Sequence, residues 1–282
     1  MGTINLSLPA DGSTADVADV NTPFNTIANE INGNLDNANI KTAAAIAGSK
    51  LADNSIDLES KASADSGWRE VTESWTYASA TTITVPTDAT TKYSVGDKIR
   101  LTQSTVKYFY ITAVAATTLT ITGGTTYTLV NAAISDVSYS KAASPLDFPQ
   151  YFNYTPTWTN LTVAGSTVTS VFALIGKTVH YRIAVVLGGG NAPSGVPTFT
   201  LPVTAAAHGG ASGNPLVGMV RYLDAGAAGY YGHVLYNTTT VVAIAVDVAS
   251  GTYVADGNVS ATVPFAFGNT DEIHISGTYQ AA

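Results

Sequence analysis

The chain has 282 residues, no cysteine and a net charge of −8, and charged residues make up only 11% of it, against a usual share of about 25%. The absence of cysteine excludes disulfides, thiolate metal sites and a cysteine nucleophile. The acidic balance argues against nucleic acid as a partner, because nucleic-acid binding needs a basic surface. No apolar run reaches the ~18 residues of a membrane span, so we expect no membrane insertion.

Charged and aromatic residues are unevenly distributed. Residues 1–65 contain nine acidic residues, three basic residues and a single aromatic, Phe24, whereas residues 148–282 contain five acidic and three basic residues. The N-terminal part is too poor in aromatics to close a core of its own. From these shifts we expect an extended peptide over 1–23, a short helix and shaft or linker over 24–66, a small β module over 67–147 and a C-terminal β head over 148–282.

A short helix is predicted near the N-terminus. Asn21 or Thr22 can cap it, with Pro23 in its first turn. A stripe of apolar residues then follows at helical spacing: Phe24, Ile27, Ile31 and Leu35. Because so short a helix is marginal alone in water, we expect it to pack on copies of itself around a threefold or twofold axis.

The next segment has apolar residues every five or six positions, which fits neither a strand nor a regular helix. These residues are Ile40, Ile46, Leu51 and Ile56. Two interpretations remain open. The segment is either a flexible linker, or a narrow shaft of several chains in which each apolar residue points at the shared axis.

The remaining sequence predicts β structure, because short runs rich in β-branched residues alternate with Gly and Pro. In the small module we expect strands over 82–85, 98–102, 107–112, 117–122 and 133–139. In the head we expect strands over 161–163, 168–174, 177–186, 198–201, 218–222, 232–236, 240–246, 260–263 and 272–279, with a turn at Asp256-Gly257. The fold class is therefore mainly β: a small antiparallel barrel or sandwich, then a β-sandwich, jelly-roll-like head.

No catalytic constellation stands out. The sequence lacks a G-x-S-x-G nucleophile elbow. The acids of the head fit solvated loops better than a paired glycosidase site, and its four histidines are not paired at metal-ligand spacing. Gly188–Gly190 is followed by Asn-Ala-Pro and predicts a hairpin loop in place of a phosphate cradle. We expect no enzyme activity, no cofactor and no metal.

Tyrosines cluster around a Gly/Ala-rich loop in the head, and Tyr222, Tyr230 and Tyr231 are the candidate receptor-binding residues. A tyrosine offers a flat apolar face and a hydroxyl, which suit protein or glycan surfaces. The alternative is that these rings pack inside the sandwich or at a subunit contact.

Several runs resemble the fibre and receptor-binding proteins of tailed bacteriophages. The run from Leu8 to Glu30 (LPADGSTADVADVNTPFNTIANE) resembles their N-termini, as does the run from Asn37 to Leu51. In the head, YTPTWTNLTV from Tyr154, IGKTV from Ile175 and TFTLPV from Thr198 resemble their head domains. The middle module carries a weaker likeness.

The resemblance implies a homotrimer located in the virion, with residues 1–23 attached to other virion proteins and the head pointing outward to a host surface glycan or protein. The scarcity of charge in the head agrees, since burial between copies explains it. Because no signal peptide is visible, we expect assembly in the host cytoplasm. The alternatives are a capsid fibre or decoration protein without essential receptor binding, a capsule-degrading tailspike and, least favoured, a cellular adhesin.

Overall fold

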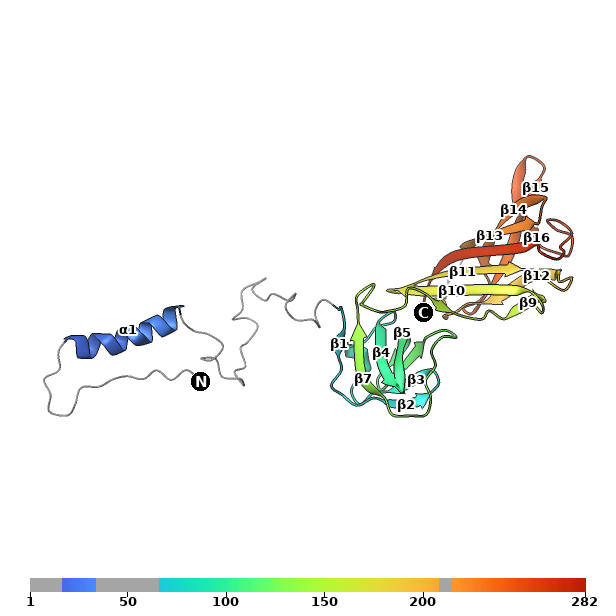
Figure 1. The fold of residues 1–282 in the computed structure, drawn as a ribbon. Coiled ribbons are helices and arrows are strands. Elements are labelled where there is room, and N and C mark those ends of the chain that lie inside the picture. Colours follow the sequence, from blue (N-terminus) through green and yellow to red (C-terminus); the bar gives the residue numbers. More distant parts are fainter. Residues whose placement is uncertain (1–16, 34–65, 208–214) are drawn as a thin grey trace. The chain divides into compact units, whose positions relative to one another are not determined.

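The computed structural model describes residues 17–33, 66–207 and 215–282. The chain divides into two units, Met1–Ser60 and Lys61–Ala282, and each is described by itself (Figure 1).

The first unit contains helix α1, Val17–Gly33. It begins before the expected cap at Asn21 or Thr22, so the predicted start is wrong and Pro23 lies inside the helix. A proline there removes the backbone donor to the carbonyl four residues earlier. One residue along, the Thr26 hydroxyl donates to the Thr22 carbonyl at 2.9 Å. The helix ends at Gly33, a residue type that favours helix ends.

The second unit starts with a module built on a seven-stranded sheet in the order β1-β7-β4-β5-β6-β3-β2, in which every described pairing is antiparallel. A short 3-10 helix, η2, spans Ala89–Thr91. The strands are β1 Arg69–Glu70, β2 Thr76–Ser79, β3 Thr82–Thr84, β4 Lys98–Gln103, β5 Thr105–Ala115, β6 Thr118–Thr122 and β7 Ser135–Ser140.

The module has its own core, because alternate residues of its strands point to one side. Ile99 and Leu101 on β4, Phe109 on β5 and Leu119 on β6 are all buried there. Trp75 and Tyr93 meet edge to face at 5.6 Å between ring centroids, an arrangement that aromatic pairs prefer.

The head is a ten-stranded antiparallel sheet in the order β8-β10-β11-β17-β13-β14-β15-β12-β9, with β16 paired to β15. The strands are β8 Phe152–Asn153, β9 Trp158–Leu161, β10 Thr167–Ile175, β11 Thr178–Val186, β12 Pro193–Thr200, β13 Leu216–Asp224, β14 Ala228–Tyr236, β15 Val241–Ser250, β16 Tyr253–Asn258 and β17 Glu272–Gln280.

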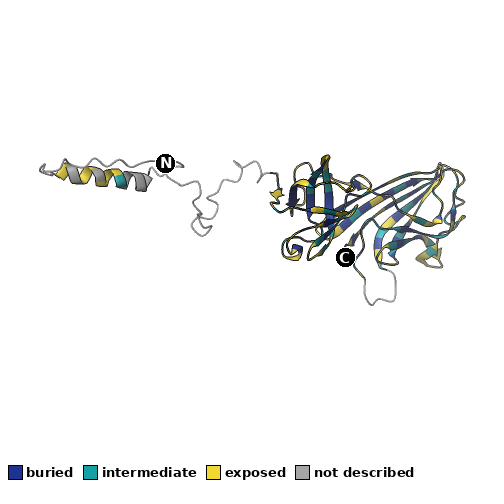
Figure 2. Cartoon of the chain, turned by 90° about the horizontal axis from the view of Figure 1, so that it is seen from below, coloured by how far each residue is buried: buried dark blue, intermediate teal, exposed yellow. Residues whose placement is uncertain are grey.

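This sheet curls so that its two halves face one another. Tyr181 on β11 lies 6.0 Å from Phe199 on β12, ring to ring, although four strands separate β11 from β12 in the sheet order. Phe199 also contacts Trp158 on β9 at 5.1 Å. Buried residues alternate with exposed ones along the strands (Figure 2). The predicted mainly β fold is confirmed, and the layers of the head are halves of one curled sheet.

The segment from Leu146 to Tyr154 connects the two sheets and includes β8. This connector packs its aromatic rings against both sheets. Phe152 is fully buried and lies 5.2 Å from Tyr110 of the module and 6.1 Å from Phe172 of the head. Gly124 has a φ of +61°, and a Cβ there would come within 2.0 Å of the Asn153 carbonyl oxygen. The module and the head are therefore joined by a packed junction. The rings of this junction belong to the same hydrophobic core as the buried residues of the head.

Candidate functional site

The outer face of the head sheet carries the side chains that do not point into the core. On β11, Val179, Tyr181, Ile183 and Val185 are buried, so their neighbours point outward. Strand pairing aligns these outward residues in rows. One row runs from Val171 through Arg182 and Ser276 to Met219, and the next runs from Thr169 through Ala184, His274 and Arg221 to Tyr231.

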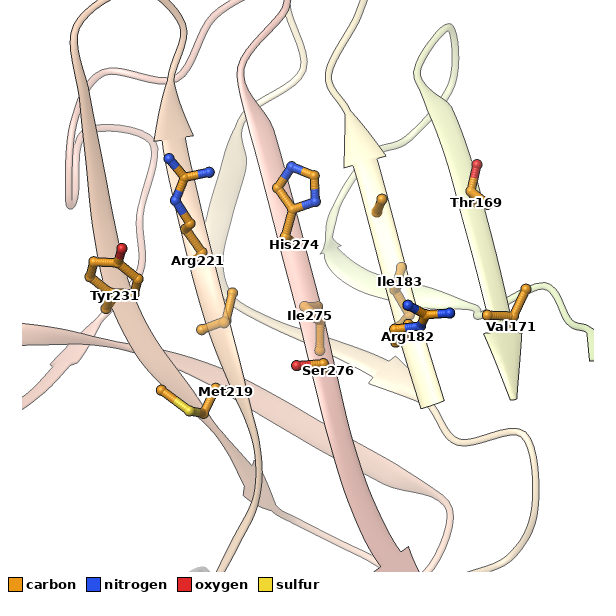
Figure 3. Close-up of a pocket in the computed structure, with 12 residues that line it drawn as sticks. Thr169, Val171, Arg182, Ile183, Met219, Arg221, Tyr231, His274, Ile275 and Ser276 are labelled. Atoms are coloured by element: carbon orange, nitrogen blue, oxygen red, sulfur yellow. The ribbon is translucent and has the colours of Figure 1, made fainter. Parts of the chain in front are cut away.

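A hollow of about 630 Å³ lies over these two rows. Its size is within the ~300–1,000 Å³ typical of ligand sites. We call it the upper hollow. Figure 3 shows Arg221 on β13 and His274 on β17 side by side. Tyr231, on β14, flanks Arg221, and Arg182, on β11, lies beside Ser276 of β17.

Both arginines of the upper hollow lack a carboxylate partner. Within the described part of the chain, the ion pairs involve Lys92, Lys141, His233 and His274 as the basic members and neither Arg182 nor Arg221. The Arg182 guanidinium lies 5.1 Å from the centroid of the Tyr151 ring, a cation–π contact. Arg221 extends over Gly229, where a Cβ would lie 3.1 Å from a guanidinium nitrogen. The glycine thus leaves room for the arginine.

The nearest acid on this face is already engaged. Glu272 precedes His274 by two residues on β17, so both side chains point outward. A Glu272 carboxylate oxygen contacts Nε2 of His274, and no acidic residue is among those that line the upper hollow. The described lining therefore combines two cations with apolar side chains and hydroxyls.

A second hollow, of about 770 Å³, continues along the same face toward the start of β13. Leu216, Met219 and Ile175 line this lower hollow and are 67%, 64% and 51% exposed. Large apolar side chains at such exposure on one face commonly mark an interaction surface.

The structure separates the three predicted receptor-binding tyrosines. Tyr222 is 0% exposed and its hydroxyl donates to the Ala245 carbonyl at 3.1 Å, so its prediction as a surface contact is wrong. Side chains of β13 alternate between the two faces of the sheet, and Tyr222 lies at a position whose side chain points into the core. Tyr230 is half-buried against Phe265, at 5.4 Å between rings. Tyr231 is 57% exposed at the edge of the upper hollow.

Sequence reasoning missed Arg182 and Arg221. The signal was present, because Lys and Arg occur only three times in the head, at Lys177, Arg182 and Arg221, and all three lie in predicted strands. Their placement on one face depends on the register between β11, β17 and β13, which a single sequence does not supply.

Elsewhere, His233 on β14 bridges two acids of the β15–β16 hairpin. Its Nδ1 lies 3.0 Å from an Asp247 carboxylate oxygen and its Nε2 lies 2.5 Å from an Asp256 carboxylate oxygen. No group of three or more His, Cys, Asp or Glu residues in the described ranges could hold a metal ion.

In the first unit, Phe24 is 66% exposed and Ile27 is half-buried. The side chain of Ile31 lies outside the described residues, as do Leu35, Ile40, Ile46, Leu51 and Ile56, so the predicted shaft contacts remain a prediction. None of the helices that the structure describes is long and apolar enough to cross a membrane.

Comparisons with known proteins add no relative: no family model, no curated protein and no solved structure matches the chain.

Proposed function

We propose that the chain is a non-enzymatic structural subunit of a bacteriophage fibre. In this proposal it forms a homotrimer, is anchored to the particle through residues 1–23 and contacts the host cell surface through the head. The observation that carries the proposal is the outer face of the head, where exposed apolar side chains and two unpaired arginines surround the two hollows. The resemblance of the N-terminus and head to phage fibre proteins supports it.

The trimer is supported by the first unit. Phe24 is its only aromatic residue and is largely exposed on α1 in a single chain. An exposed aromatic on an isolated helix is unfavourable in water, whereas packing on two symmetry-related helices would bury it.

The oligomeric state tests this part of the proposal. Light scattering with mass determination on the full chain at micromolar concentration should give three times the mass of one chain, and Phe24→Ala should weaken that assembly. Asn25→Ala, a change of an exposed neighbour on the same helix, is the control. A stable monomer for the unmodified chain would contradict the trimer.

Attachment is tested in the phage that encodes the chain. Deletion of residues 1–16, which leaves α1 complete, should leave a folded trimer that no longer enters particles, which immunoblotting of purified particles would detect. Normal incorporation of the shortened chain would overturn the anchoring role. Electron microscopy of labelled particles would then distinguish a tail position from a capsid position.

A further inference from the structure

Two of the three Lys and Arg side chains of the head line the upper hollow. Arg182 is exposed and Arg221 is half-buried, and neither has an ion-pair partner among the described residues. Unpaired guanidinium groups bind carboxylates through two parallel hydrogen bonds. A head with so little charge that places both cations at one hollow offers a site for an anion.

The spacing of the arginines suits a group larger than a free ion. Arg182 pairs with Ser276, and Arg221 pairs with His274, on the two sides of β17. With strands about 4.8 Å apart and a rise of about 3.3 Å per residue, their Cα atoms are offset by roughly 10 Å across the sheet and 7 Å along it. A polymer with carboxylates on separate sugar units can reach both arginines, whereas a single free anion would reach only one.

The other lining groups match a carbohydrate. Tyr231 borders the hollow with much of its surface exposed, and an aromatic face can stack against the apolar side of a sugar ring. Ser276 and Thr169 add exposed hydroxyls from β17 and β10. One face of the sheet therefore offers an aromatic ring for stacking on a sugar, two hydroxyls for hydrogen bonds to its hydroxyls and two guanidinium groups for carboxylates.

We propose that the upper hollow binds an acidic polysaccharide, with Arg182 and Arg221 each on the carboxylate of a different sugar unit and Tyr231 against a sugar ring. This inference rests on the proposed function, because it names the ligand class of the head that contacts the host.

The test compares charged and neutralised forms of the same polymers. Polygalacturonate, alginate and polysialate are titrated into the full chain by calorimetry, each beside its methyl ester, in which the carboxylates are masked and the sugars unchanged. At least one acid should bind about tenfold or more tightly than its ester. Arg182→Gln and Arg221→Gln should each weaken that binding by about tenfold, since each removes a charge-assisted contact.

Two controls keep the test specific. Lys177→Gln removes the third cation of the head, which lies outside the hollow, and should leave binding unchanged. Tyr231→Leu should weaken binding while Tyr231→Phe retains most of it, because only the first loses the aromatic face. If no acid binds better than its ester, or if the arginine variants bind as the unmodified chain does, the inference is overturned. The trimer mass and particle incorporation are separate readouts, so the proposed fibre role can stand without it.

Discussion

Buried tyrosine hydroxyls in the head differ in their hydrogen bonding. Those of Tyr181, Tyr222 and Tyr279 donate to backbone carbonyls of Val217, Ala245 and Val203 at 3.2, 3.1 and 2.7 Å. The hydroxyl of Tyr154 is buried without a partner in the described structure, and burial raises its pKa. A buried polar group without a partner is destabilising.

Replacement of these tyrosines by phenylalanine should therefore have opposite effects. Tyr154→Phe is expected to leave the free energy of unfolding unchanged or to raise it by up to about 1 kcal/mol, whereas Tyr279→Phe should lower it by about 1–2 kcal/mol because Val203 loses its partner. Urea denaturation followed by tryptophan fluorescence measures both. A larger loss for Tyr154→Phe than for Tyr279→Phe would contradict the assignment.

Glu73 is held by three donors in the middle module. The Thr87 hydroxyl, Lys92 Nζ and the Tyr93 hydroxyl lie 2.6, 2.9 and 3.1 Å from its carboxylate oxygens. Thr87 contributes most, followed by Lys92 and Tyr93, and together they lower the pKa of Glu73 below its ordinary value of 4.5. Burial raises the pKa of Tyr93 to about 12, so its hydroxyl remains a donor at neutral pH.

The pH dependence of stability follows from the sign of this shift. Because the folded pKa is lowered, the carboxylate stabilises the fold fully above pH 4.5 and this contribution is lost as pH falls through the folded pKa. Glu73→Gln should lower the free energy of unfolding by about 1 kcal/mol at pH 7 and by much less at acidic pH, with Thr87→Val reproducing part of the loss. An equal effect at both pH values, measured by urea denaturation followed by tryptophan fluorescence, would rule this out.

At the scale of elements, close approach decides where glycine is required. Gly277 on β17 pairs with Gly218 on β13, and the ring of Tyr181 lies beside both. A Cβ at Gly277 would come within 2.2 Å of the Val217 carbonyl oxygen and 2.5 Å of the Tyr181 hydroxyl. The backbone oxygen cannot move without distorting the sheet.

Gly277→Ala should therefore destabilise the head by more than about 2 kcal/mol, within the range of overpacked cores. Gly268→Ala is the matched control, since its nearest neighbour, an Asp271 carboxylate oxygen, would lie 3.7 Å away, an ordinary contact. Thermal unfolding of the two variants tests the pair. A Gly277→Ala protein as stable as Gly268→Ala would show that the strands can separate to admit the methyl group.

The strands that sequence alone predicted are those with dense β-branched residues. The runs that became β3, β4, β5, β6, β7, β10, β11, β12, β13, β14, β15 and β17 were all expected, at least over part of each strand. The turn expected at Asp256-Gly257 is wrong, because both residues lie in β16, where pairing with β15 overrides their poor strand propensity. The strand expected over 260–263 is also wrong, since there Ser260 and Val263 form only an isolated bridge.

The site was less accessible to sequence reasoning than the fold. Tyr231 could be proposed from the tyrosines and the Gly/Ala-rich loop around it, but Tyr222 has the same chemistry. The two differ in that Tyr222 points to the inner face of the sheet from β13 and Tyr231 to the outer face from β14. To predict which face of the sheet a side chain occupies, the register of its strand must be known to the residue, since a shift of one residue moves every side chain of the strand to the other face. The pairing of Arg221 with His274 across β13 and β17 further requires contacts between segments about 50 residues apart.

At the scale of the whole second unit, the junction decides whether the module and the head behave as one body. Phe152 contacts Tyr110 and Tyr127 of the module, at 5.2 and 6.0 Å, and Phe172 of the head at 6.1 Å. The backbone joins the same surfaces, because the Thr125 amide donates to the Asn153 carbonyl at 2.7 Å. Stability of the module thus depends on rings supplied by the connector.

We expect Phe152→Ala to uncouple the two sheets. Truncation of a buried phenylalanine removes about 3–5 kcal/mol, and here the loss falls on the contacts between the module and the head. Differential scanning calorimetry should show one transition for the unmodified chain and two for Phe152→Ala, with the module, followed by hydrogen exchange of its backbone amides, unfolding first. Leu146→Ala, an exposed change in the same connector, should keep the single transition. A single transition in Phe152→Ala, merely shifted to lower temperature, would mean that the backbone contacts at Gly124 and Asn153 suffice to hold the sheets together.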